Sequence, residues 1–143
     1  MKASILREAG KFDIVDIKLP KLKPDEVLVK VGCVGICGTD VSVYHGIYKA
    51  KENVILGHEY DGTVAEVGDE VSKVKVGDHV ASQASWGCGR CYWCYNGMPS
   101  YCEKPNMLGR TIDGSLAEYI IVPENVLLKI SEEVNPIEAQ GAV

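Results

Sequence analysis

The sequence predicts a mainly β domain, built as a barrel or sandwich of many short strands. The chain has 143 residues, is rich in valine and glycine, and carries only short apolar patterns. Apolar and polar residues partly alternate within these patterns, which is typical of half-buried strands. Turn signals at residues 68–70 (Gly-Asp-Glu) and 77–78 (Gly-Asp) separate them at close spacing. The length fits a single domain with one core, and the sequence contains no internal repeat or interdomain linker.

The predicted strands follow one another along the chain. In the third strand Val27, Val29 and Val31 point one way, while Leu28 and Lys30 point the other way. Proline and aspartate residues mark the turn before it. The strands are predicted at residues 2–7, 13–18, 26–31, 60–67, 78–82, 117–122 and 126–130.

Two short helices complete the prediction. The first begins at Thr39 or Asp40, both favourable N-cap residues, and runs towards His45. The second begins after Asn135, with Pro136 at its first position, where a missing N–H is tolerated. Both helices are short, so the predicted domain stays mainly β.

Composition narrows the classes of function. The net charge is −5 with acidic and basic residues mixed along the chain, whereas a nucleic-acid surface needs a basic face. The N-terminus lacks the apolar core of a signal peptide, and no apolar stretch approaches the length of a membrane span. We therefore expect a cytoplasmic protein with no nucleic-acid or membrane partner, whose cysteines are reduced or bind metal.

Four cysteines form the most informative pattern: Cys88, Cys91, Cys94 and Cys102. Two successive Cys-x-x-Cys steps and a fourth cysteine nearby can surround one tetrahedral metal ion, and zinc is the usual occupant of a closed four-thiolate site. Two disulfides are an alternative, but they need an oxidising compartment. An iron–sulfur cluster is another, although the bacterial ferredoxin pattern has a shorter last gap followed by proline, where this chain has Glu103. A closed zinc site would hold the loop in place and leave no open position for chemistry.

A second set of metal-binding residue types lies upstream, at Cys37 and at His58-Glu59. Catalytic zinc sites use three protein ligands and keep one position open for water or substrate. Cys37 and His58 provide two such ligands, and Asp40 is a candidate to orient His58 by accepting its other ring N–H. The residues alone leave a second interpretation open, because a single cysteine is commonly a small core residue and a single histidine is commonly structural.

Six motifs follow one another along the chain. They are Gly35-Ile36-Cys37-Gly38-Thr39-Asp40, Gly57-His58-Glu59-Tyr60-Asp61-Gly62, Val67-Gly68, Val76-Gly77-Asp78-His79-Val80, the four-cysteine loop and Gly114-x-x-Ala117-Glu118-Tyr119. Together they resemble the zinc-containing alcohol dehydrogenases of the medium-chain dehydrogenase/reductase superfamily, most closely the alcohol, threonine and sorbitol dehydrogenase branches. The resemblance covers essentially the whole chain. It implies a GroES-like β-barrel catalytic domain over residues 1–143, with a structural-zinc lobe at about residues 86–104.

The resemblance also implies roles for individual residues. Cys37 and His58 match the first two ligands of the catalytic zinc, and Glu59 matches the neighbouring acid that can approach the metal during ligand exchange. Thr39 matches the hydroxyl that contacts the substrate alcohol and starts a proton relay, and Asp40 matches the partner of the zinc-binding histidine. The cysteines of the four-cysteine loop match the structural-zinc ligands. The implied chemistry is zinc acting as a Lewis acid on the substrate hydroxyl, with hydride transfer to NAD or NADP.

Three departures from the family pattern matter. Ser42 stands where many relatives place a relay histidine. His45, one helical turn further, is a candidate substitute, although a histidine in such a position is more commonly just exposed. In the family, the third catalytic ligand lies just beyond the segment that residues 136–143 resemble, so this chain does not include it. No Gly-x-Gly-x-x-Gly run marks a Rossmann coenzyme domain. We therefore expect a truncated or excised domain that binds no coenzyme itself and is inactive alone, with a natural stand-alone module as the alternative.

These inferences combine into one predicted function. The chain is predicted to be the catalytic domain of a zinc-dependent, NAD(P)-linked alcohol or polyol dehydrogenase, with a small-molecule alcohol as substrate and a homo-oligomer as a candidate assembly. The alternative is a non-enzymatic zinc-binding module that uses the GroES-like barrel as a scaffold. A scaffold would not need the set Cys37, Thr39, His58 and Glu59.

Overall fold

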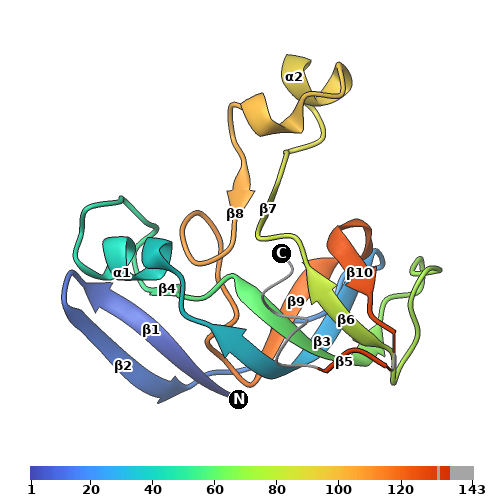
Figure 1. Ribbon diagram of the computed structural model, residues 1–143, viewed down its shortest axis with the longest axis horizontal. Helices are drawn as coiled ribbons and strands as arrows, with labels where there is room; N and C mark the ends of the chain where they lie inside the picture. Colours follow the sequence, from blue (N-terminus) through green and yellow to red (C-terminus); the bar gives the residue numbers. More distant parts are fainter. Residues whose placement is uncertain (132, 136–143) are drawn as a thin grey trace.

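A curled antiparallel sheet forms the body of the protein in the computed structural model, which describes residues 1–131 and 133–135. Its five strands have the order β10-β6-β5-β3-β9 (Figure 1). The strands are β3 (Glu26–Gly35), β5 (Glu59–Val67), β6 (His79–Ser82), β9 (Tyr119–Pro123) and β10 (Leu127–Lys129). The short helical turn η2 (Glu124–Val126) joins the last two strands. The predicted mainly β fold is therefore confirmed.

The main hydrophobic core packs against one face of the curled sheet. Val27, Val29, Val80 and Val122 are fully buried there, together with the ring of Tyr60. The valines of β3 alternate with more exposed residues, as the sequence pattern predicts for a strand with one buried face. Burial of these side chains supplies the main driving force for curling the sheet around the core.

A smaller sheet and a helix pack beside the barrel. The sheet has the order β2-β1-β4 and consists of β1 (Lys2–Glu8), β2 (Lys11–Asp16) and β4 (Val54–Ile55). The helix α1 (Gly38–Tyr44) follows β3 and buries Val43 against Leu6, Val54 and Leu56. This second hydrophobic cluster fixes the helix that begins directly after Cys37.

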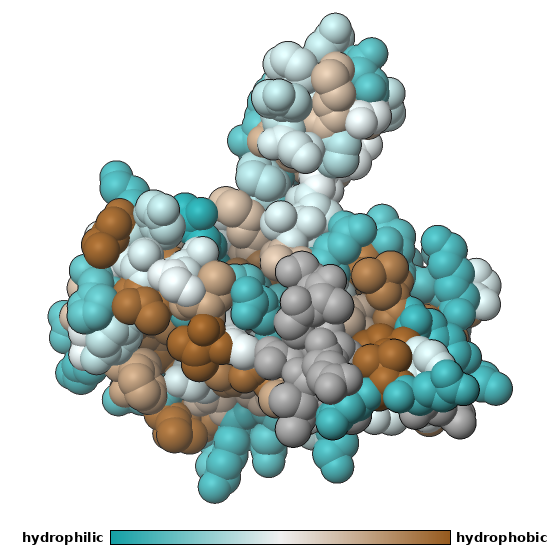
Figure 2. Space-filling view, in the orientation of Figure 1, coloured by the Kyte–Doolittle hydropathy of each residue, from teal (hydrophilic) through white to brown (hydrophobic). Residues whose placement is uncertain are grey.

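A lobe projects from the barrel on a two-stranded ribbon (Figure 1). The ribbon pairs β7 (Ser85–Trp86) with β8 (Asn106–Met107). Beyond the ribbon lie only the one-turn helix α2 (Tyr92–Tyr95) and the short turn η1 (Pro99–Tyr101), neither of which has a buried residue. Figure 2 shows the lobe as a separate knob above the body.

The predicted elements mostly lie where the sequence placed them. All seven predicted strands overlap a strand of the structure, although β2 begins two residues earlier and β3 continues to Gly35. The prediction that the first helix is capped by Thr39 or Asp40 was wrong. Its N-cap is Cys37, whose thiol accepts the Thr39 N–H, because the Asp40 carboxylate is used at the third helical position to accept the Cys37 N–H.

Two further expectations concern helices. The helix predicted to begin at Pro136 lies outside the described residues. Within the described part of the chain, the longest helix is the seven-residue α1, and no helix is long and apolar enough to cross a membrane.

Candidate metal centres

The first centre brings together Cys37, His58 and Glu59. One possible ligand atom from each residue lies within 4.8 Å of the others. Cys37 lies in the short connection between β3 and α1, and Glu59 begins β5. Strand pairing causes the approach, because Gly35 at the end of β3 lies opposite Glu59 at the start of β5. A thiol, an imidazole and a carboxylate at this spacing form a donor set that suits zinc.

Asp40 holds the two ligand-bearing segments together. One carboxylate oxygen, Oδ2, accepts the N–H of Cys37 at 3.0 Å. The other, Oδ1, accepts the N–H of Gly57 at 3.0 Å and lies 3.3 Å from Nδ1 of His58. Asp40 is only 5% exposed, so these contacts are shielded from water. A single buried side chain therefore fixes the backbone at both segments and the orientation of the histidine ring.

Charge is shared between Asp40 and His58. Burial raises the pKa of Asp40, but hydrogen bonds from His58 and from the Cys37 N–H outweigh it and hold the pKa below its ordinary value. The hydrogen bond to Asp40 raises the pKa of His58 to about 9, against the opposing effect of burial. With Nδ1 held by the carboxylate, Nε2 is the ring nitrogen left for a metal ion, which would compete there with a proton.

Glycines allow a loop to pack directly on the His58 segment. Gly57 has a φ of +90°, and a Cβ there would lie 2.8 Å from Oγ of Ser115. A Cβ on Gly114 would lie 2.1 Å from the carbonyl oxygen of Gly57, which is far inside van der Waals contact. A Cβ on Gly109 would approach the Gly57 nitrogen to 3.0 Å. The loop that follows β8 therefore lies against the backbone that leads into His58.

The other predicted catalytic residues lie along α1. Thr39 is half-buried in the first turn, and its N–H points to the Cys37 sulfur at 3.5 Å. Ser42 donates its hydroxyl to the carbonyl of Gly38 at 3.0 Å. His45 is exposed at the end of the helix, where its ring packs edge-on against Tyr44. The structure thus places Thr39 next to the centre and His45 at the far, solvent-exposed end of the helix.

The second centre consists of Cys88, Cys91, Cys94 and Cys102 in the projecting lobe. One sulfur from each lies within 4.8 Å of the others. The Cys91 sulfur is 3.5 Å from that of Cys94 and 3.9 Å from that of Cys102. Bonds of about 2.3 Å to a central tetrahedral zinc would place the sulfurs about 3.8 Å apart. Disulfide bonding requires about 2.05 Å, so the sulfurs are unbonded and their spacing fits a single four-coordinate ion.

The lobe backbone also favours thiolate sulfurs. Backbone N–H groups of Cys94 and Glu103 lower the pKa of Cys91 to about 6, whereas burial and the neighbouring Cys91 thiol raise the pKa of Cys94 to about 11. The N–H of Cys88 donates to the Cys102 sulfur at 3.2 Å. A Cβ on Gly87 would lie 2.6 Å from the Cys94 sulfur, so only glycine fits beside the cluster. These features suit a structural four-cysteine site with no open coordination position.

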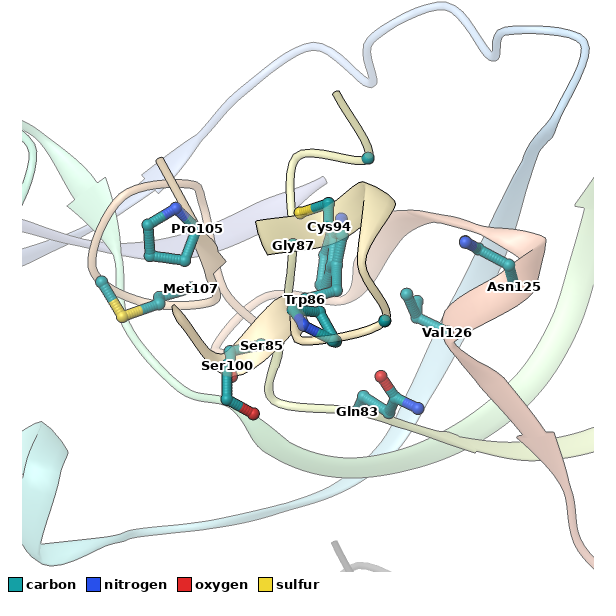
Figure 3. A pocket seen from close by; sticks show the side chains of 13 residues that line it. Gln83, Ser85, Trp86, Gly87, Cys94, Ser100, Pro105, Met107, Asn125 and Val126 are labelled. Atoms are coloured by element: carbon teal, nitrogen blue, oxygen red, sulfur yellow. The ribbon is translucent and has the colours of Figure 1, made fainter. Parts of the chain in front are cut away.

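A hollow of about 590 Å³ lies between the lobe and the barrel (Figure 3). Trp86, Met107 and Val126 contribute apolar surface to it, and Gln83 and Asn125 contribute amides. No residue of the first centre lines the hollow. Of the four lobe cysteines, Cys94 alone is among the residues that line it (Figure 3). The hollow is therefore distinct from the cluster around His58.

Comparison with known proteins identifies the family. The chain matches the family model of the alcohol dehydrogenase GroES-like domain over residues 23–132. The chain belongs to this family. The resemblance noted in the sequence is thereby confirmed, and so is the GroES-like fold.

Curated relatives include sugar, polyol and amino-acid dehydrogenases. L-threonine 3-dehydrogenase of Caldanaerobacter subterraneus subsp. tengcongensis is 45% identical over 117 residues, covering 79% of this chain and 34% of that protein. D-arabinose 1-dehydrogenase (NADP(+)) of Saccharolobus solfataricus is 36% identical, covering 96% of this chain and 40% of that protein. The chain thus spans about a third to two fifths of the length of these relatives.

Solved structures share the fold across nearly the whole chain. A protein described as a zinc-binding dehydrogenase of Sinorhizobium meliloti, bound to NADP, has a TM-score of 0.91 and 34% identity, covering 97% of this chain and 41% of that one. Galactitol-1-phosphate dehydrogenase of Escherichia coli has a TM-score of 0.90 and 29% identity, covering 98% and 41%. A short chain alcohol dehydrogenase of Escherichia coli complexed with NADH reaches 0.90 and 35%, again covering 98% and 41%.

Proposed function

We propose that this chain is the catalytic domain of a zinc-dependent, NAD(P)-linked alcohol or polyol dehydrogenase. The observation that carries the proposal is the convergence of Cys37, His58 and Glu59 around the buried Asp40. A scaffold needs neither a three-donor cluster nor a carboxylate that spans both of its segments. The four-cysteine lobe is the second, structural metal site in this proposal.

Cys37 and His58 would hold the catalytic zinc, with Glu59 as a carboxylate within reach of the same ion. Zinc in this position supplies Lewis acidity towards the substrate hydroxyl. Asp40 keeps His58 in the tautomer with Nδ1–H, because its oxygen lies 3.3 Å from that nitrogen. Its bonds to the N–H groups of Cys37 and Gly57 keep the two ligands at a set separation.

Thr39 would receive the substrate hydroxyl. Its backbone N–H is anchored on the Cys37 sulfur, which places its side chain in the first turn of α1 beside the centre. Ser42 and His45 follow at intervals of three residues, on one face of the helix. We assign proton removal to Thr39, with Ser42 and His45 as the polar residues on the way to solvent.

The nicotinamide site would lie on another polypeptide segment. The sequence carries no Gly-x-Gly-x-x-Gly run, and the described residues offer no such turn between a strand and a helix. Two of the solved relatives hold NADP or NADH, which makes a nicotinamide the coenzyme of choice for this proposal. The curated relatives indicate a substrate among sugars, polyols or hydroxy amino acids.

The test joins this chain to the coenzyme domain of a relative, including the third catalytic ligand that the family supplies there. Zinc content and nicotinamide absorbance are measured with L-threonine, D-arabinitol, D-arabinose and simple alcohols. Turnover with at least one of these substrates, and its loss in Cys37→Ala, is the expected result. Two bound zinc ions with no turnover on any alcohol would favour the non-enzymatic scaffold instead.

A further inference from the structure

Arg110 is a half-buried cation that forms no ion pair with the residues that the structure describes. Its guanidinium carbon lies 5.1 Å from the centroid of the Tyr48 ring, so the two groups stack. Its Nη1 approaches only the sulfur of Met107, at 3.8 Å, which is a weak acceptor. Its Nε is buried and has no hydrogen-bond partner among the described residues. Leaving a buried donor of a charged group unpaired is costly, so this nitrogen calls for a functional explanation.

The carboxylate next along the chain is already engaged elsewhere. Asp113 accepts the N–H of Ile55 at 3.3 Å and lies 3.5 Å from Nζ of Lys51. Among the ion pairs of residues 1–131 and 133–135, none includes Arg110. The guanidinium therefore remains available for an anion, and its planar fork suits a carboxylate or a phosphate group.

The position of Arg110 links it to the first metal centre. Gly109, directly before it, packs against the nitrogen of Gly57, the residue that precedes His58. Tyr48 lies just beyond α1, the helix that begins next to Cys37, and its N–H is bound by the Ser42 carbonyl. Arg110 thus follows a residue that packs on the His58 segment, and its stacking partner Tyr48 follows the helix that begins next to Cys37.

We propose that Arg110 binds an anionic group of the alcohol substrate, either a carboxylate or a phosphate. Tyr48 would hold the plane of the guanidinium, so that two parallel N–H groups face the anion. This assignment rests on the proposed function and narrows its substrate class to hydroxy acids or polyol phosphates, in preference to neutral polyols. Arg110 is then a specificity-determining residue, while the chemistry stays with the metal centre.

The experiment uses the chain joined to the coenzyme domain of a relative, and three substrates that share a six-carbon skeleton. Sorbitol is neutral, gluconate carries a carboxylate, and sorbitol 6-phosphate carries a phosphate. We expect one or both anions to exceed sorbitol in kcat/KM by at least about tenfold, and the better anion identifies the group. Arg110→Met should remove that advantage, and Arg110→Lys should retain part of it because the charge remains.

Arg90→Met is the matched control, since Arg90 is an exposed cation in the lobe. It should leave the ratio between anionic and neutral substrates unchanged. Equal kcat/KM values for all three substrates, or a uniform fall in Arg110→Met, would overturn the assignment.

A binding measurement separates this inference from the proposed function. The 143-residue chain is labelled with nitrogen-15 and titrated with gluconate and sorbitol 6-phosphate, and the Arg110 Nε–H signal is followed. If that signal shifts while the chain joined to a relative's coenzyme domain turns over no alcohol, the anion site stands and the dehydrogenase proposal is refuted. No shift with either anion overturns the anion site, whatever the enzyme assay shows.

Discussion

The two metal centres differ in how the chain brings their ligands together. In the lobe, one short segment from Cys88 to Cys102 supplies all four sulfurs. In the barrel, Cys37 and His58 come from separate segments that meet because β3 and β5 pair. The lobe centre is therefore local in sequence, whereas the barrel centre depends on tertiary structure.

This difference indicates whether metal binding folds the protein around a centre, or whether the folded protein forms the centre before metal binds. The lobe helices bury no residue, and Cys102 is the one cysteine of the lobe that is buried in the described structure. So small a segment has no core to hold it, and we expect a metal ion held by the four cysteines to supply the stability. The barrel centre lies between two hydrophobic clusters, and Asp40 fixes it through hydrogen bonds. We infer that metal binding folds the lobe, whereas the folded barrel holds the ligands of the other centre in place before metal binds.

The largest expected effect comes from breaking the lobe centre. Cys91→Ser should remove one zinc per chain and open residues 87–103, because structural zinc binding contributes on the order of 10–16 kcal/mol and is coupled to folding. Hydrogen exchange should then be fast in the lobe and unchanged in β3 and β5. Metal analysis gives the loss of zinc directly. A lobe that keeps its protected amides and its metal in this variant would contradict the assigned difference.

The converse variant removes the barrel centre. Cys37→Ala in the chain joined to a coenzyme domain should lower turnover by about 1,000-fold or more, roughly 4 kcal/mol, since Lewis-acid stabilisation is worth several kcal/mol. The lobe should keep its zinc and its protected amides. Cys33→Ala is the matched control, because Cys33 is a half-buried thiol that belongs to neither centre. Comparable losses from both cysteines would show that the effect is general destabilisation.

Disturbing the glycine packing beside the barrel centre should have a smaller effect. Gly114→Ala should lower the free energy of unfolding by about 3 kcal/mol, because the new methyl group would lie 2.1 Å from the Gly57 carbonyl oxygen. Gly38→Ala is the control, since a Cβ there meets nothing within 4 Å. Urea denaturation compares the two. Equal stability of the two variants would show that the loop is free to move away from His58.

The same contrast explains what the sequence could predict. The four lobe cysteines are close enough in the chain for their spacing alone to indicate one tetrahedral ion. The roles of Cys37 and His58 rest on resemblance, because strand pairing, which spacing does not reveal, brings them together. The N-cap of α1 was predicted at Thr39 or Asp40, but the N-cap is Cys37. The Asp40 carboxylate instead contacts the N–H groups of Cys37 and Gly57 and the ring of His58.

Other features of the barrel centre left no pattern in the sequence. Arg110 is one cation in a loop, and only the folded chain shows that its Nε is buried and its ring partner is Tyr48. The contact of Gly114 with Gly57 is equally invisible, because it joins residues far apart in the chain. Local rules identify caps, turns and ligand spacings, whereas such approaches depend on the tertiary fold.

The smallest effect tests whether the barrel fixes its centre through Asp40. Asp40→Asn keeps the shape of the side chain but replaces one acceptor oxygen with an N–H₂ group. Either the Cys37 N–H or the Gly57 N–H, each now 3.0 Å from a carboxylate oxygen, then faces a donor. Loss of a residue behind a metal-binding histidine typically lowers metal affinity 10- to 100-fold, about 1.4–2.7 kcal/mol.

A chelator competition with two resolved zinc sites measures this change for each centre. Asp78→Asn is the matched control, because Asp78 is also buried and accepts from Lys129 at a distance of 2.7 Å, away from both centres. We expect Asp40→Asn to weaken zinc at Cys37 and His58 only, and Asp78→Asn to weaken neither centre. If Asp40→Asn weakened both centres alike, Asp40 would act on overall stability, and the barrel centre would be no more preorganised than the lobe. If it weakened neither, strand pairing alone would hold the two ligands in place.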